Sequence, residues 1–410
     1  MKKIKIKDII KDHWDKVVET YGHRIRKNVF KEVEKMIGCG SLNNGYIEYK
    51  CEDCGEIKRV GFTCKSRFCT SCGKVHVDEW VEELTARLIN CKHRHMVFTI
   101  PDTLRKFFIK RRKRLSILTK CSAEVIKSWL KERNKKEEYT PGIVSVIHTF
   151  GRDLKWNPHV HVLVTEGAVG NKTEWKNINY FSYPMLRKRW QKMLLDEIEK
   201  EIGKREGKRL KDEMYKKYPH GFYVYGKGEI KSAKGAARYV GRYTGRPAIS
   251  ESRIIDYDGE YVTFCYERHE DGKRIKEKIH AFEFIKRLII HIPEKRFNMV
   301  RYYGIYARNN KHKKRLPTFK MLDEKVLEQL RKLRTWKCRI LKAFGVDPLE
   351  CTKCKGKMVM NDIYYKEYGS MLERYRLRAL RQVEREIANL NNMYHSIKKV
   401  THGEIEPLFI

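Results

Sequence analysis

Residues 142–165, GIVSVIHTFGRDLKWNPHVHVLVT, contain two runs that are rich in β-branched residues, Gly142–Phe150 and His159–Thr165. Such runs favour strands. Between them lies a more polar segment with Gly151 and Pro158, which is typical of a tight connection. The stretch therefore predicts two neighbouring strands that pair antiparallel.

Histidines on these strands form a candidate metal site. Side chains alternate along a strand, so His159 and His161 point to the same face, as a shared ion requires. His148 lies on the preceding strand, where it can fold back beside them as a third ligand. A His-x-His pair alone is more often a surface or structural feature, so the metal interpretation depends on what accompanies the pair.

A pair of tyrosines further along the chain accompanies it. The stretch Ser232–Tyr243 predicts a helix, and Tyr239 and Tyr243 are spaced i and i+4, so both hydroxyls lie on one helical face. Taken alone, the tyrosines could equally pack in the core or contact a DNA backbone. Together with the histidines they indicate phosphodiester chemistry through tyrosine. A phenol with a pKa of about 10 is a poor nucleophile at neutral pH, so a divalent ion is needed. We expect Mg²⁺ or Mn²⁺, although imidazole also accepts softer ions.

The composition agrees with a nucleic-acid partner. The 410 residues include 90 Lys and Arg against 52 Asp and Glu, a formal net charge of +38 that predicts binding to a polyanion. With 41% hydrophobic and 11% aromatic residues, the chain is not a disordered basic tail. Its length favours about two or three domains. No apolar run is long enough to span a membrane, and no signal peptide is recognised, so we expect a cytoplasmic protein.

Cysteines indicate a structural zinc site. Twelve cysteines in a cytosolic protein favour metal over disulfides. Two Cys-x-x-Cys-Gly knuckles have the spacing of a four-thiolate zinc ribbon, with Cys51, Cys54, Cys69 and Cys72 as ligands and Cys39 and Cys64 as alternates. Buried free thiols are the bland alternative, and this suits Cys91, Cys121 and Cys265 better. A third knuckle, Cys351-Thr-Lys-Cys354, has no obvious partner.

Three regions follow from these patterns. Residues 1–92 form a predicted zinc-binding, DNA-docking domain, residues 93–300 the catalytic domain, and residues 301–410 a basic C-terminal region with a Cys-x-x-Cys knuckle. Helices are expected around 14–36, 104–130, 184–217 and 232–243. Further strands are expected at 95–100, 222–225, 261–266 and 275–284.

The residues resemble the HUH endonucleases, and within them the two-tyrosine transposases of the insertion sequence 91 and common-region (ISCR) kind. The resemblance covers most of the chain. In chain order its motifs are the cysteine block, Phe98–Pro101, His148–Leu154, Asn157–Val162, Arg238–Tyr243 and Asp347–Cys354. One departure is Phe68, which stands before Cys69 where the family's zinc block leads us to expect a histidine.

The resemblance implies a fold and roles for the site residues. The fold is α+β: an antiparallel-sheet HUH domain with a ferredoxin/RRM-like palm and the histidine strand near its centre, an N-terminal zinc ribbon and a basic C-terminal region. His159 and His161 would be metal ligands, and Tyr239 and Tyr243 the nucleophiles. The third ligand varies among HUH enzymes: His148 resembles the three-histidine arrangement of relaxases, and an acidic or amide residue of this chain in its place is the alternative.

The implied activity is that of a bacterial insertion-sequence transposase, which cleaves and joins single-stranded DNA at element ends and target through 5′-phosphotyrosine intermediates. A plasmid-type replication initiator or relaxase would share this chemistry. A non-catalytic zinc-containing nucleic-acid-binding protein is the alternative from another class. Candidate DNA contacts are the basic residues of the tyrosine helix and of the helix before it in sequence: Lys234, Arg238, Arg242, Arg187 and Arg189.

Overall fold

The computed structural model describes residues 4–241, 248–268, 271–309, 324–332 and 335–401. The chain forms two compact units. The first comprises residues 1–37 and 64–347, and the second comprises residues 38–63 and 348–410. These units do not coincide with the three predicted regions, whose division stays a prediction. Among the described residues, no helix combines the length and the apolar character that crossing a bilayer requires.

An antiparallel sheet is the centre of the first unit. Its strands run in the order β11 (Val300–Gly304), β4 (Tyr139–Phe150), β5 (Trp156–Gly170), β3 (His93–Phe98) and β7 (Val224–Ile230), and β6 (Lys176–Asn177) pairs with β5. The hairpin of β4 and β5 confirms the antiparallel pair predicted from residues 142–165. With β5 in the middle, the expected central position of the histidine strand is also confirmed.

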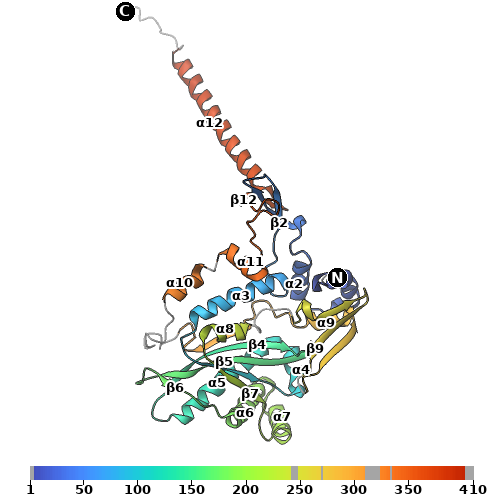
Figure 1. Cartoon of the computed structure of the whole chain (residues 1–410), viewed down its shortest axis with the longest axis vertical. Helices are drawn as coiled ribbons and strands as arrows, with labels where there is room; N and C mark the ends of the chain where they lie inside the picture. The colour runs from blue at the N-terminus through green and yellow to red at the C-terminus, as the bar shows by residue number, and fades with distance from the viewer. Residues whose placement is uncertain (1–3, 242–247, 269–270, 310–323, 333–334, 402–410) are drawn as a thin grey trace, which may run out of the picture. The chain divides into compact units, whose positions relative to one another are not determined.

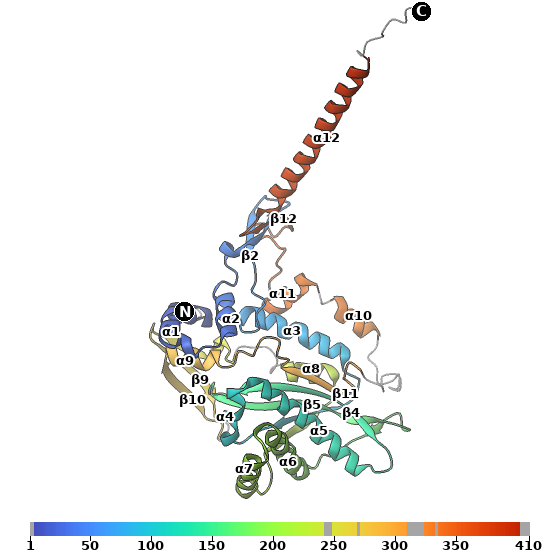
Figure 2. The ribbon, with the colours of Figure 1, turned by 180° about the vertical axis from the view of Figure 1, so that it is seen from behind.

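Helices cover both faces of this sheet (Figure 1 and Figure 2). On one side lie α4 (Asp102–Lys110), α5 (Leu115–Arg133), α6 (Tyr183–Ile202) and α7 (Lys204–Lys217); on the other lie α3 (Thr70–Arg87) and α8 (Ala233–Gly241). The alternation of β5 explains the two layers: Val160, Val162 and Val164 join the core under α5 and α6, and Leu163 joins the core under α8. The odd-numbered residues of β5, His159 and His161 among them, therefore face α8.

The long predicted helix over residues 184–217 is divided in the structure. Gly203 has a φ of +92°, a left-handed conformation that ends α6 and lets α7 begin one residue later. Helical periodicity continues across this point in the sequence, so only the glycine marks the break. Further helices of the first unit are α1 (Ile6–Tyr21), α2 (Lys27–Ile37), α10 (Glu324–Lys332) and α11 (Trp336–Phe344), and it has 3-10 turns at Gly22–Arg24, Arg112–Arg114 and Glu251–Arg253.

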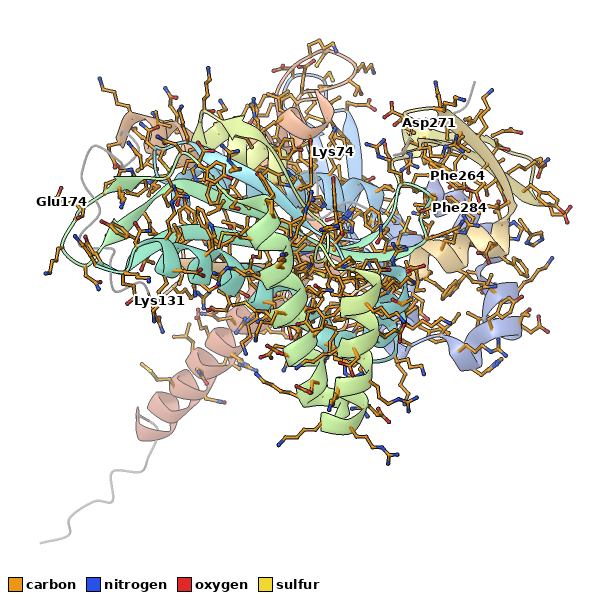
Figure 3. All side chains as sticks on the ribbon, turned by 90° about the horizontal axis from the view of Figure 1, so that it is seen from below. Lys74, Lys131, Glu174, Phe264, Asp271 and Phe284 are labelled. Atoms are coloured by element: carbon orange, nitrogen blue, oxygen red, sulfur yellow. The ribbon has the colours of Figure 1, made fainter. Side chains whose placement is uncertain are left out.

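A small second sheet also belongs to the first unit. It consists of β8 (Ile254–Tyr257), β9 (Tyr261–Glu267) and β10 (Arg274–His280), and α9 (Ala281–Ile289) packs against it. The rings of Phe264 and Phe284 lie 5.9 Å apart between sheet and helix (Figure 3). The strand predicted over residues 275–284 is too long, because the His280 side chain accepts a hydrogen bond from the Phe282 amide and so caps a new helix.

The second unit is a four-stranded antiparallel sheet followed by a long helix. Its strands run in the order β13 (Gly369–Ser370), β12 (Met358–Tyr365), β1 (Tyr46–Cys51) and β2 (Ile57–Gly61), and its helices are the 3-10 turn Leu42–Asn44 and α12 (Met371–Thr401). Two chain segments far apart in sequence thus share one sheet through the pairing of β1 with β12.

Candidate active site and metal centres

Strand pairing brings three histidines together. His148 on β4 lies directly opposite His159 on β5 in the register of the hairpin. The His159 Nε2 atom is 3.1 Å from His148 Nδ1 and 3.1 Å from His161 Nε2. The three candidate ligand nitrogens all lie within 4.8 Å of one another. The structure therefore places all three predicted histidines around one point.

The spacing of these nitrogens suits a divalent ion. Ligands about 2.1 Å from a metal and at right angles to each other are about 3 Å apart, close to the two 3.1 Å separations. The remaining ring nitrogen of His159, Nδ1, lies 2.6 Å from the Asn157 carbonyl oxygen, to which it donates. This bond fixes the tautomer and leaves the Nε2 lone pair directed at the shared point.

The imidazoles are held in the neutral form that metals bind. Burial lowers the pKa of His159 to about 4. For His148 and His161, burial and then the neighbouring imidazoles lower the pKa well below its usual value. At neutral pH all three imidazoles are therefore neutral, the form that binds a metal.

A fourth histidine connects this cluster to the tyrosine helix. His95, on β3, is buried, and its Nε2 atom lies 2.9 Å from His161 Nδ1. Its ring also packs edge-on against the ring of Tyr239, with centroids 4.7 Å apart. The predicted strand over residues 95–100 contained His95, but only the pairing of β3 with β5 shows that it reaches the cluster. The other two predicted residues of the motif, Arg242 and Tyr243, lie outside the described residues.

Close packing fixes the position of α8 over the sheet. Its buried face consists of Ala233, Ala236, Ala237 and Val240, and small side chains of this kind allow a helix to lie close to its support. At Gly241 the space is tighter still, since a Cβ atom there would lie 2.3 Å from Val81 Cγ2 on α3. Helix α8 is therefore held between α3 and the sheet, with Tyr239 directed at His95.

The predicted DNA contacts divide into two groups. Lys234 and Arg238 are exposed on α8. Arg187 and Arg189 are half-buried on α6 and already engage protein groups: Arg187 donates to the Val224 carbonyl, and Arg189 pairs with Glu132.

Two exposed tyrosines that we did not single out from the sequence lie beside Arg187. Tyr223 and Tyr225 are each 49% exposed, and their rings are nearly parallel with centroids 6.4 Å apart. The Arg187 guanidinium lies 4.9 Å from the Tyr223 ring centroid. Tyr225 is opposite Val97, which is itself opposite His161, so Tyr225 is two strands from the histidines on the same face of the sheet.

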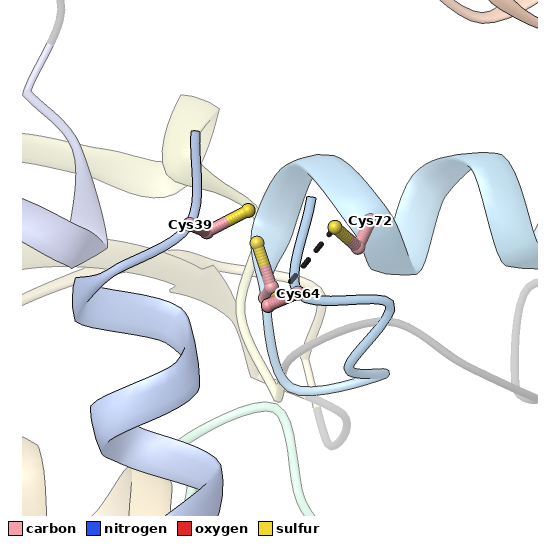
Figure 4. A group of neighbouring side chains, drawn as sticks. Cys39, Cys64 and Cys72 are labelled. Atoms are coloured by element: carbon pink, nitrogen blue, oxygen red, sulfur yellow. Dashed lines mark hydrogen bonds between the residues drawn. The ribbon is translucent and has the colours of Figure 1, made fainter. Parts of the chain in front are cut away.

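The cysteines group differently from the predicted ribbon. The sulfurs of Cys39, Cys64, Cys69 and Cys72 lie within 4.8 Å of one another, as do those of Cys51, Cys54, Cys351 and Cys354. Figure 4 shows Cys39 beside Cys64 and Cys72. The Sγ atoms of Cys64 and Cys72 are 3.6 Å apart. The set of Cys51, Cys54, Cys69 and Cys72 is thus not brought together.

Strand pairing in the second unit explains why the cysteines group in this way. Cys51 ends β1 and Cys54 lies in the turn to β2, and β1 pairs on its other side with β12, which follows Cys354. Cys39 and Cys64, the predicted alternate ligands, lie with the second knuckle, Cys69 and Cys72. Cys91, Cys121 and Cys265 are buried and belong to neither group.

Comparisons with known proteins define the class. One matching family is described as a putative transposase, over residues 142–314, and the other as a transposase zinc-binding domain, over residues 9–100. The two matches define a transposase that contains a zinc-binding domain. No solved structure matches the chain significantly.

Two relatives align with most of the chain. The transposase for insertion sequence element IS801 from Pseudomonas savastanoi pv. phaseolicola is 30% identical over 370 residues, which cover 84% of this chain and 86% of the relative. The putative transposase y4qJ from Sinorhizobium fredii (strain NBRC 101917 / NGR234) is 24% identical over 343 residues, or 78% and 85% of the two chains. The chain belongs to the insertion sequence 91 family of transposases.

Membership confirms the resemblance inferred from the motifs. A transposase binds DNA, cleaves it and transfers strands, so the expected enzyme class and DNA partner are confirmed at this level. The zinc-binding family and the cysteine clusters support structural zinc.

Proposed function

We propose that this transposase is an HUH endonuclease that cleaves and joins single-stranded DNA through tyrosine. The observation that carries the proposal is the placement of Tyr239 against His95, which in turn contacts one of three clustered histidines. The nucleophile candidate and the metal-site candidate thus belong to one centre, although they come from β4, β5 and α8.

His148, His159 and His161 would hold the catalytic ion, for which we propose Mg²⁺ or Mn²⁺. A bound ion supplies charge that polarises the scissile phosphate and stabilises the leaving oxygen. The donor set consists of neutral imidazoles, which suit Mn²⁺ and softer ions better than Mg²⁺. His159 is oriented by the Asn157 carbonyl, and His161 is oriented in the same manner by His95.

Tyr239 would attack the phosphorus. A new bond forms between the phenolic oxygen and phosphorus, and the bond from phosphorus to the 3′ oxygen breaks. The phenol loses its proton and the leaving 3′ oxygen gains one, which yields a 5′-phosphotyrosine and a free 3′-hydroxyl. The covalent bond conserves the phosphodiester energy, so the 3′-hydroxyl of another strand can reverse the step without ATP. A second nucleophile, Tyr243, would allow two strands to be held at once.

The exposed tyrosines support a single-stranded substrate. Unpaired bases stack on aromatic side chains, and cationic residues beside them follow the backbone. Tyr225 lies on the histidine face of edge strand β7, its ring is nearly parallel to that of Tyr223, and the Arg187 guanidinium from α6 lies over the Tyr223 ring. Lys234 and Arg238 add exposed charge on α8. We propose that single strands at the element ends and the target cross this surface to reach Tyr239.

The remaining assignments rest on family membership. We assign a structural zinc ion to Cys39, Cys64, Cys69 and Cys72. These four cysteines cluster together, and all of them lie inside the segment that matches the zinc-binding family. We also propose that the protein acts in the bacterial cytoplasm, at the nucleoid. A replication initiator or relaxase would use the same chemistry, and the transposase relatives favour strand transfer.

Metal-ligand variants test the proposal. His159→Ala and His161→Ala are expected to lose cleavage of a single-stranded oligonucleotide in Mn²⁺ while they keep its affinity, measured by fluorescence anisotropy. His220→Ala, at an exposed position on the loop before β7, is the matched control and should behave as wild type. Full cleavage in the two site variants, with binding lost instead, would contradict the ligand role.

A further inference from the structure

The second unit contains two knuckles with the same backbone geometry. In the first, the Cys51 amide donates to the Glu56 carbonyl and the Gly55 amide to the Cys51 carbonyl. In the second, the Cys351 amide donates to the Gly356 carbonyl and the Lys355 amide to the Cys351 carbonyl. The residue that follows the second cysteine is left-handed in both, with φ of +70° at Gly55 and +66° at Lys355.

A left-handed lysine is uncommon, and its presence shows how closely the second knuckle repeats the first. Non-glycine residues avoid this region because of their Cβ atom. The Gly356 amide also points at Cys354 Sγ, with a separation of 3.4 Å. A Cβ atom at Gly356 would lie within contact distance of both that sulfur and the Asp53 carboxylate, so the two knuckles approach each other closely here.

The four sulfurs have the separations of a tetrahedral zinc site. Thiolates about 2.3 Å from a zinc ion at tetrahedral angles are about 3.8 Å apart. Cys51 Sγ lies 3.4 Å from Cys354 Sγ, and Cys54 Sγ lies 3.8 Å from Cys351 Sγ. All four are within 4.8 Å of one another and all are free thiols.

The described part of the second unit has a small buried apolar core. Its buried apolar cluster consists of Tyr49, Cys51, Cys351 and Met358, with Ile47, Val60 and Leu349 packed against it. Two of the four buried members are cysteines of the site. A core this small does not stabilise a fold by itself, and small domains of this kind depend on a metal or on disulfides.

We propose that Cys51, Cys54, Cys351 and Cys354 bind a second structural zinc ion, which joins two distant chain segments into one folded unit. The ion would tie the turn between β1 and β2 to the segment before β12, and so support the sheet from which α12 continues. The match to the transposase zinc-binding domain ends at residue 100 and includes only half of these ligands. This site is independent of the DNA chemistry proposed above.

Zinc content of the full-length protein tests the site. Cys54→Ser and Cys354→Ser are each expected to lower zinc by one equivalent per chain, measured by inductively coupled plasma mass spectrometry. The double variant should lose the same single equivalent, since both residues serve one ion. Cys338→Ser on α11 lies outside both cysteine clusters and should leave zinc unchanged. Wild-type zinc content in Cys354→Ser, or loss of two equivalents in the double variant, would overturn the proposal.

Two further measurements keep the test decisive if a variant folds poorly. In the wild-type protein, a mercurial that attacks thiolates should release two equivalents of zinc, and release of one would contradict a second site. In Cys354→Ser, hydrogen exchange should become faster in β1 and β12 while β5 of the first unit stays protected. Unchanged protection of β1 and β12 would argue against a zinc ion that holds the second unit together.

Discussion

Gly241→Ala is the sharpest test of how α8 is held. A Cβ atom at this position would lie 2.3 Å from Val81 Cγ2, whereas carbon atoms in contact are about 3.5–4.0 Å apart. Val81 is β-branched and cannot swing away easily, so α8 or α3 must move by about 1 Å or more. Such a displacement would carry Tyr239 away from His95, which its ring now contacts.

Two opposing effects set the magnitude. Overpacking of a filled site lowers the stability of the fold by about 1–3 kcal/mol, whereas replacing glycine with alanine in a helix raises the stability by up to about 1 kcal/mol. We therefore expect Gly241→Ala to lower the free energy of unfolding by about 1–2 kcal/mol, measured by urea denaturation. DNA cleavage should fall at the same time because the nucleophile is displaced.

A Val81→Ala background separates the two effects. Removing the Val81 methyl groups removes the clash but leaves the helix propensity, so Gly241→Ala should become neutral or stabilising there. The two substitutions should thus show a favourable coupling of about 1–3 kcal/mol, and the double variant should regain cleavage. Equal destabilisation by Gly241→Ala in both backgrounds, or full stability and activity of the single variant, would refute the close packing of α3 against α8.

Three other predictions follow from the first unit. Tyr223→Ala and Tyr225→Ala should each weaken single-stranded DNA binding by about 1–3 kcal/mol in anisotropy titrations. Tyr215→Ala, at an exposed tyrosine of α7, is the control and should leave binding unchanged. Equal effects of all three substitutions would argue against a stacking surface. His95→Ala should lower Mn²⁺ affinity about 10- to 100-fold, as expected for a residue that orients a ligand, and unchanged affinity in a metal titration would remove that role. Burial lowers the pKa of His93 to about 4, so between about pH 6.5 and pH 4 the unfolded chain binds more protons than the folded one, and the stability of the fold should decrease as the pH is lowered through this range. His93→Gln should therefore flatten the dependence of the melting temperature on pH. An unchanged slope in this variant would contradict the contribution of His93.

The part of the fold that follows from local sequence was predictable. The hairpin of β4 and β5 depends on two adjacent strands and a short connection, and its register alone places His148 beside His159. Alternation then places His161 on the same face. The candidate metal site was therefore accessible from one continuous stretch of about two dozen residues.

Features that depend on the pairing of strands far apart in the sequence could not be predicted from the sequence alone. His95 reaches the cluster only because β3 lies next to β5, and Tyr225 joins the same face only through β7. The predicted grouping of the cysteines differs from that in the structure for the same reason, since the spacing within a knuckle does not show which other knuckle it meets. The pairing of β1 with β12 brings Cys51 to Cys354 across most of the chain.

A covalent protein–DNA adduct tests the tyrosine chemistry most directly. Incubation with a single-stranded oligonucleotide and Mn²⁺, followed by a denaturing gel and peptide mass spectrometry, should show DNA joined through its 5′ phosphate to Tyr239 or Tyr243. Tyr239→Phe and Tyr243→Phe should each reduce the adduct, and the double variant should abolish it. Undiminished adduct in the double variant, or attachment at another residue, would contradict the proposal that these tyrosines are the nucleophiles.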